Sequence, residues 1–286
     1  MEGLEKYLRA AEAAVASARA NVADMGETVH VLELAGNWFS VGLSLVQRLE
    51  GVTVTSVTDS ADSRSAFTAV AEESGLAHRY RSIASGNQLV LDRRYSVVVV
   101  DLVEVNGLIR QNVLQDVAWH VRSPCRAVPS AVQVIGQLIS CDSLGPQNSV
   151  VPEATCGLDL SLLDRFGVAA FQGIDLATLP HAALTAPFLC GCIDAARPEL
   201  APKAPQSIAV KVTEPGVAVA LAFWFDLSLD DCTHLITRST SLASYHRQAC
   251  CMLPLQPKLL AGETITLSVR LTPGGTVTAA VTGCRN

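Results

Sequence analysis

The chain has 286 residues, of which 49% are hydrophobic and 17% charged, so it can bury a large core and is not of the disordered class. Its formal net charge of −6 offers no basic surface to a phosphate backbone, which argues against nucleic-acid binding. Its longest apolar run, VAVALAFWF from Val217, is strand-sized and far below the roughly 18–20 residues of a membrane helix.

Residues 1–27 form the first expected element, an amphipathic helix. Charged residues such as Glu5 and Arg9 lie among its apolar ones, so the segment is not a secretory signal peptide. Apolar residues recur at gaps of four and three, which predicts one stripe that packs on another surface. The stripe consists of Leu4, Leu8, Ala11, Val15, Ala18 and Val22.

Residues 28–128 alternate between apolar strands and helices. The expected strands are TVHVLEL, VTVTSV and YSVVVVDLV, and the expected helices are SVGLSLVQRLEG, SADSRSAFTAVAEESG and NGLIRQNVLQDVAWHV. The β-branched run YSVVVVDLV is typical of a strand buried on both faces of a parallel sheet. This alternation predicts a doubly wound, Rossmann-like α/β domain.

Residues 129–286 change character and contain several short β-rich runs, separated by turns such as EPG and TPGG. Such a pattern predicts an antiparallel β-barrel or sandwich. Residues from about 153 to 197 interrupt it and read as a helical or irregular insertion.

The nine cysteines are scattered and include no CxxC pair. We interpret them as reduced thiols of an intracellular protein, expected in the cytoplasm with the nucleus left open. No His/Cys group has zinc spacing, so no metal site is expected.

An α/β domain followed along the chain by a β-barrel resembles the protein arginine methyltransferase family. The segment from Leu221 to Val269 is similar to the family's last barrel strands, where a Thr-His-Trp-x-Gln loop precedes an apolar strand, a proline and a Gly-Glu turn. Here the loop runs from Ser244 to Gln248, and the turn is Gly262-Glu263. NGLIRQNVLQDVAW and DLATLP…APF look closest to the second half of members with two modules in one polypeptide.

The resemblance implies a class I methyltransferase domain, a β-barrel with a helical arm insertion at about 153–197, and S-adenosylmethionine as cofactor. The cofactor turn should follow a strand that ends in a carboxylate and should read GxGxG, because glycines let the backbone approach the ligand. Large aromatics stand there instead, and we interpret them as core that fills the cofactor space. The aligned positions are Glu33 for the carboxylate, Ala35, Asn37 and Phe39 for the glycines, Gly36 out of phase, and Trp38 beside Phe39.

The resemblance also implies an acidic ribose ligand at the end of the second strand. Thr58 stands at that position, and Asp59 follows one residue late. Asp59 could serve if the turn shifts, but we favour Asp59 as a cap of the following helix.

Arginine methylation in the family uses two glutamates on one loop, which hold the substrate guanidinium by charge-assisted hydrogen bonds. In the corresponding loop Asp101 falls at the first glutamate, and Arg110 or Gln111 falls at the second. Arginine there would repel the substrate. Glu104 is the one glutamate of the loop, so a pair of Asp101 with Glu104 is the alternative.

In the barrel loop, His246 could act as a general base, but we favour a polar loop residue. The resulting prediction is a catalytically degenerate module that supports an active arginine methyltransferase module, in cis or as a dimer partner, by packing as a pseudo-dimer next to a protein substrate. The alternative is an active, S-adenosylmethionine-dependent protein arginine methyltransferase. The family resemblance also leaves open that the chain is one half of a longer protein.

Overall fold

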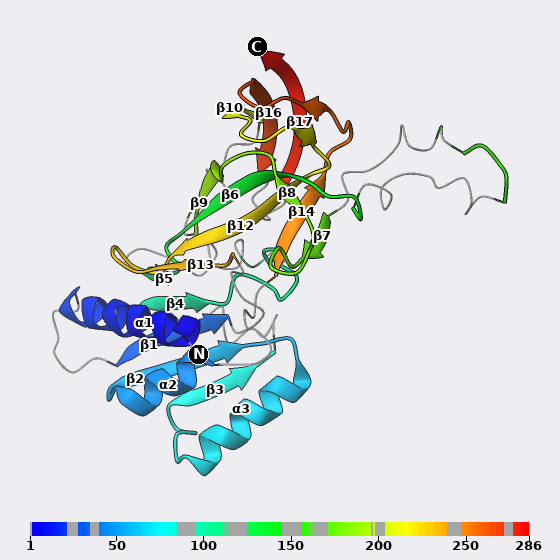
Figure 1. Cartoon of the computed structure of the whole chain (residues 1–286). Coiled ribbons are helices and arrows are strands. Elements are labelled where there is room, and N and C mark those ends of the chain that lie inside the picture. Colours follow the sequence, from blue (N-terminus) through cyan, green and yellow to red (C-terminus); the bar gives the residue numbers. More distant parts are fainter. Residues whose placement is uncertain are drawn as a thin grey trace.

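In the computed structural model, an α/β part and an all-β part are joined along the chain, with the C-terminus at the far end of the all-β part (Figure 1). The structure describes residues 2–21, 28–34, 40–84, 95–110, 113, 125–144, 156–160, 162, 171–195, 197, 204–238, 247–271 and 277–285.

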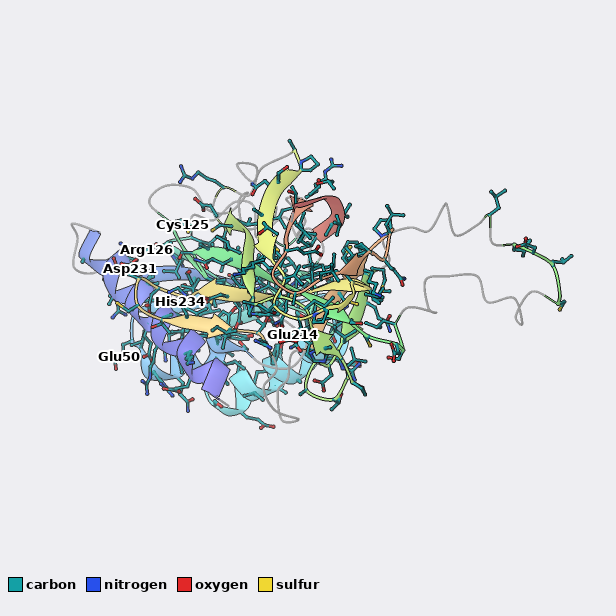
Figure 2. The ribbon with its side chains drawn as sticks, turned by 45° about the horizontal axis from the view of Figure 1, so that its top comes forward. Glu50, Cys125, Arg126, Glu214, Asp231 and His234 are labelled. Atoms are coloured by element: carbon teal, nitrogen blue, oxygen red, sulfur yellow. The ribbon has the colours of Figure 1, made fainter. Side chains whose placement is uncertain are left out.

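The expected N-terminal helix is present as α1 (Glu2–Asn21). Its predicted stripe is buried at Leu8, Ala11, Val15 and Ala18, and Leu4 packs against the same core; Val22 lies outside the described residues. Arg19 of α1 donates a hydrogen bond to the carbonyl oxygen of Glu50, and Glu50 lies beside this helix (Figure 2). α1 packs against the sheet and the next helix of the α/β part and also against the all-β part, so the stripe is covered within the chain.

The α/β part is built on a parallel sheet with the strand order β3-β2-β1-β4-β5. This order confirms the Rossmann-like prediction: β1 is central, β2 and β3 follow on one side of it, and β4 and β5 follow on the other. All of β4 is buried, as its run of valines predicted. The strands are β1 (Val29–Leu34), β2 (Val52–Val57), β3 (Tyr80–Ile83), β4 (Val97–Val100) and β5 (Arg126–Val128), and the helices between them are α2 (Val41–Arg48) and α3 (Ala61–Glu73).

One element of this part differs from the sequence prediction. A helix was expected to begin at Asn106, but residues 104–110 form a tight turn closed by an antiparallel bridge between Val103 and Ile109. The dipeptide Asn106-Gly107 explains the difference, because Asn and Gly favour turns and Gly107 has a φ of +80°. Val113 is helical, and the neighbouring residues of the expected helix lie outside the described residues.

The all-β part consists of antiparallel sheets, as predicted. A seven-stranded sheet has the path β7-β14-β12-β6-β8, with β13 paired to β12 and β9 paired to β6; a three-stranded sheet is β10-β16-β17, and β11 pairs with β15. The strands are β6 (Ala131–Ser140), β7 (Phe171–Ile174), β8 (Ala182–Ala183), β9 (Phe188–Asp194), β10 (Gln206–Lys211), β11 (Gly216–Val217), β12 (Ala220–Ser228), β13 (His234–Ile236), β14 (Gln248–Met252), β15 (Lys258–Leu259), β16 (Thr264–Leu271) and β17 (Val277–Arg285).

The segment at about 153–197, expected to be a helical or irregular insertion, contains strands in its described part. Residues 171–195 include β7, β8 and β9, which pair with β14 and β6 in the seven-stranded sheet. Residues 156–160 stand apart from the sheets (Figure 1), and Leu158, Leu160 and Leu162 are exposed. Residues 161 and 163–170 lie outside the described residues, so the helical arm stays a prediction.

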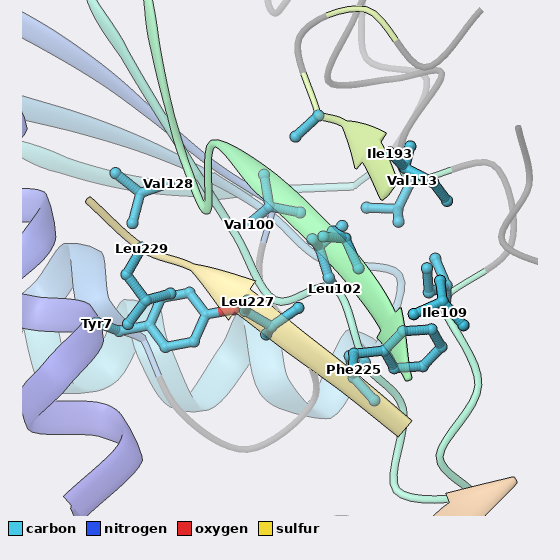
Figure 3. Packing of buried hydrophobic residues seen from close by; sticks show 14 of the residues in the cluster. Tyr7, Val100, Leu102, Ile109, Val113, Val128, Ile193, Phe225, Leu227 and Leu229 are labelled. Atoms are coloured by element: carbon cyan, nitrogen blue, oxygen red, sulfur yellow. The ribbon is translucent and has the colours of Figure 1, made fainter. Parts of the chain in front are cut away.

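One hydrophobic cluster runs through both parts. Tyr7 of α1 and Val128 of β5 lie with Leu227 and Leu229 of the barrel in this cluster (Figure 3). The two parts therefore share a core, and α1 helps to join them. Among the described helices, none is both long and apolar enough to cross a membrane.

Candidate functional site

Glu33 near the end of β1 is buried, at 3% exposure, where the resemblance expects the cofactor carboxylate. Its Oε2 accepts a hydrogen bond from Ser40 Oγ at 2.6 Å, and its Oε1 accepts one from the Gly42 backbone N–H at 2.8 Å. Ser40 is also the N-cap of α2, because its Oγ accepts from Leu43 N. Glu33 thereby ties the end of β1 to the first turn of α2.

Gly42 permits this close approach of helix and strand. A Cβ at this position would lie 2.6 Å from Val54 Cγ1 and 2.7 Å from Glu33 Oε2, both far inside contact distance. Sequence reasoning missed Ser40 and Gly42. A signal was present, since serine directly before a helical run is an N-cap pattern.

A row of polar side chains extends from Glu33 across the sheet. Glu33 pairs in register with Ser56 of β2, which pairs with Ser82 of β3, so all three share a face. Tyr80 Oη lies 3.1 Å from Ser40 Oγ. The Ser40 hydroxyl hydrogen already goes to Glu33, so Tyr80 donates in this contact.

Burial shifts the pKa values of two residues of this row, Glu33 and Tyr80. It raises the pKa of Glu33, against the hydrogen bonds from Ser40 and Gly42, which lower it. Burial also raises the pKa of Tyr80, and the charge of Glu33 adds to that effect. Tyr80 therefore keeps its proton at neutral pH and can serve as the donor to Ser40.

The glycine positions of the expected cofactor turn, Ala35, Gly36 and Asn37 together with Trp38 and Phe39, lie outside the described residues. The interpretation of the two aromatics as a filling of the cofactor space stays a prediction, as does the role of His246, which lies outside them too.

Asp59 follows β2 with an exposed side chain, but it is not the cap that we expected. The N-cap of α3 is Ser60, whose Oγ accepts a hydrogen bond from Ser63 N at 3.2 Å. Arg64 Nη1 donates to the carbonyl oxygens of Thr58 and Asp59, at 2.7 and 2.9 Å. Arg64 thus fixes the turn through two backbone carbonyls, and Ser60, one residue after Asp59, caps α3.

Asp101 and Arg110 both reach the Leu34 carbonyl at the carboxyl ends of β1 and β4. The Leu34 carbonyl oxygen accepts from the Asp101 backbone N–H at 3.1 Å and from Arg110 Nη2 at 3.0 Å. Burial raises the pKa of Asp101 to about 6, the charge of Arg110 acts to lower it, and that of Glu33 to raise it. Asp101, expected at the first glutamate position, and Arg110, one of the two positions expected for the second, therefore lie near each other. Gln111, the other position expected for the second glutamate, lies outside the described residues.

Glu104 has a different environment from Asp101. It is exposed at the tip of the turn, where its Oε2 accepts from Asn106 Nδ2 at 3.0 Å and its backbone carbonyl accepts from Gly107 N at 2.9 Å. Its carboxylate stabilises the turn, and no contact between Glu104 and Asp101 is found in the described part of the chain.

The same turn docks onto the barrel. Arg247 N donates to the Val105 carbonyl at 3.1 Å, and a Cβ at Gly107 would lie 2.5 Å from the Arg247 carbonyl oxygen. Gln248, fully buried, accepts from Leu176 N at 3.2 Å and donates to the Thr237 carbonyl at 3.0 Å. The loop after β4 is therefore fixed to β14, whose first residue is Gln248. In the described ranges no group of three or more His, Cys, Asp or Glu could hold a metal ion.

Comparison with known proteins supports the resemblance. No protein-family model matches the chain. It is 30% identical over 183 residues to protein arginine N-methyltransferase 9 of Mus musculus, and 28% identical over 206 residues to that of Homo sapiens; these alignments cover 62% and 70% of the chain. The chain is a relative of the protein arginine N-methyltransferases.

The alignments span only 21% and 23% of the mouse and human proteins. A bacterial relative, arginine N(omega)-methyltransferase of Streptomyces achromogenes subsp. streptozoticus, is 29% identical over 175 residues, which is 60% of the chain and 47% of that protein. The fold matches the Trypanosoma brucei PRMT1 enzyme–prozyme heterotetrameric complex with AdoHcy, with a TM-score of 0.70, at 14% identity, over 93% of this chain and 83% of that one. The methyltransferase fold is thereby confirmed.

Proposed function

We propose that this chain is a methyltransferase-like module that keeps the arginine methyltransferase fold but does not itself transfer methyl groups. The observation that carries the proposal is the side chain of Arg110. It stands where the family would place the second glutamate, and it donates to Leu34 beside Asp101. A substrate guanidinium needs carboxylates at this place, and a resident cation repels it in a partly desolvated site.

AdoHcy is part of the trypanosomal complex, and the family resemblance extends S-adenosylmethionine to this chain only as a proposal. The described residues do not fit it: both oxygens of Glu33 accept hydrogen bonds from Ser40 and Gly42 of its own chain, and Thr58 replaces an acidic ribose ligand. We therefore propose a module without tightly bound S-adenosylmethionine.

The positive role that we propose is support of an active arginine methyltransferase module, in the same polypeptide or as a dimer partner, next to a protein substrate in the cytoplasm. Two facts favour this role. The mouse and human relatives are several times longer than the matched region, and the trypanosomal neighbour is an enzyme–prozyme heterotetramer. Such a supporting role requires the packing surface of the module, and does not require an intact catalytic site.

Isothermal titration of the purified chain with S-adenosylmethionine tests the proposal, together with a methylation assay on an arginine-rich protein. We expect no saturable heat and no methyl incorporation by the chain alone. Addition of the chain to an active arginine methyltransferase module from the same family should raise the methylation rate of that module. Micromolar cofactor binding together with methyl transfer by the chain alone would favour the alternative, an active enzyme.

A further inference from the structure

The Leu34 carbonyl oxygen is a shared acceptor for two groups of the loop after β4. The Asp101 backbone N–H approaches it from the continuation of β4, and Arg110 Nη2 approaches it from the end of the loop. The backbone of Arg110 is itself anchored, because its N–H donates to the Leu102 carbonyl at 2.9 Å. Arg110 is therefore fixed both by its side chain, at Leu34, and by its backbone, at Leu102.

The surroundings of this guanidinium are partly closed to water. Asp101 and Arg110 are partly buried, and Leu102 and Ile109 beside them in sequence are buried. Tyr7 of α1 is buried, at 4% exposure, and the charges of Asp101 and Arg110 both act on its phenol. The place thus combines a carboxylate and a carbonyl acceptor, which are groups that bind a guanidinium.

We propose that the carboxyl ends of β1 and β4 form a guanidinium-binding site that the side chain of Arg110 fills from within the chain. The ligand class is a monosubstituted guanidinium, such as methylguanidinium or the side chain of an arginine. This inference deepens the proposed function and rests on it in one respect, since a filled site explains why a substrate arginine is not held. Removal of the Arg110 side chain leaves Asp101 without its cation and Leu34 with one donor fewer.

Chemical rescue of Arg110→Ala tests this site. The variant should unfold at a lower temperature than the wild type, and millimolar methylguanidinium chloride should raise its midpoint in a saturable way. At about ten times the Kd, the expected rise is roughly 2–5 °C. Wild type should not shift, because its site is filled, and methylammonium chloride at equal ionic strength should have little effect, because it lacks the planar fork of donors.

Two matched variants complete the rescue experiment. In Arg197→Ala, which removes an exposed arginine paired with Asp194, methylguanidinium should cause no rise. In the double variant Asp101→Asn/Arg110→Ala the rise should be lost, because the carboxylate is gone. The proposal is overturned if Arg110→Ala shows no saturable rise, or if wild type shows the same one.

A measurement on folded wild-type protein covers the case in which Arg110→Ala does not fold. Phenylglyoxal modifies accessible arginines, and mass spectrometry reports the rate at each one. Arg110 should react about tenfold more slowly than Arg197, because exposure requires the loss of a charge-assisted hydrogen bond. Equal rates would overturn the proposal. Methyl transfer by wild type would contradict the proposed function and leave both of these results unchanged.

Discussion

Gly42 is the residue at which the turn after β1 tolerates least change. Its place at the start of α2 brings the helix against Val54 and Glu33, and a methyl group there would lie 2.6 Å from Val54 Cγ1. The hydrogen bond from Gly42 N to Glu33 depends on this contact. The buried carboxylate of Glu33 and the absence of a side chain at Gly42 therefore depend on each other.

Gly42→Ala should lower the free energy of unfolding by about 1–3 kcal/mol, because extra volume in a packed site forces the helix away from the strand. Urea denaturation measures the change. Gly3→Ala is the matched control at the start of α1, where an added Cβ meets Leu235 at an ordinary 3.7 Å. That variant should keep or slightly gain stability, since alanine favours helix. A wild-type free energy in Gly42→Ala would contradict the proposed contact.

Asp101 makes stability depend on pH, because burial raises its pKa from 3.8 to about 6. A carboxyl with a raised folded-state pKa contributes stability below its unfolded pKa, and this contribution is lost as pH rises through the folded pKa. Between pH 4 and 7, wild type should therefore lose roughly 2 kcal/mol relative to Asp101→Asn, which cannot titrate. Urea denaturation at several pH values measures the difference. A difference that does not vary with pH would show that Asp101 keeps an ordinary pKa.

The turn from Glu104 to Leu108 is the element that joins the loop after β4 to the barrel. Two glycines allow the contact from opposite sides: Gly107 approaches Arg247 and Gln248, and a Cβ at Gly173 would lie 2.7 Å from the Asn106 carbonyl oxygen. The position of Asp101 and Arg110 is thus coupled to β7 and β14 through one short turn.

Gly107→Ala should destabilise the protein by about 2 kcal/mol or more, because it combines a positive φ with a collision against backbone. Gly262→Ala separates the two causes: Gly262 has a φ of +90°, but an added Cβ there meets nothing within 4 Å. Thermal unfolding should show the larger loss in Gly107→Ala, with faster hydrogen exchange at Arg247 N. Equal losses in both variants would mean that the docking contact contributes nothing beyond backbone strain.

At the scale of the whole molecule, the continuous core predicts that the two parts unfold together. The described helices lie in the α/β part, whereas Trp224 lies in β12 of the barrel. In a variant with Trp224 as the single tryptophan, helix circular dichroism and fluorescence should give coincident urea transitions, because α1, β5 and the barrel share one cluster. Two separated midpoints would show that the parts are independent folding units.

Although it did not predict β3 and β5, the amino-acid sequence by itself determined β1, β2 and β4 of the parallel sheet, the first three helices, the antiparallel second part and the family resemblance. These features follow from hydrophobic periodicity and residue order, which are local properties of a chain. It also indicated Glu33, Asp101 and Arg110 as positions of interest. It did not predict the turn at Asn106-Gly107, because the helical spacing of the following residues masked the turn signal and the docking partners Arg247 and Gln248 are far away in sequence.

Only the tertiary structure decided what the candidate residues do. Arg110 donates to Leu34, 76 residues earlier, and Glu33 bonds to the first turn of α2, which itself fits only because Gly42 lacks a side chain. Contacts of this kind depend on which strands are neighbours in the sheet, and a local sequence pattern does not encode that order. The sequence identified an arginine at an unexpected position; the fold brought that arginine to the Leu34 carbonyl, because β1 and β4 are neighbours in the parallel sheet.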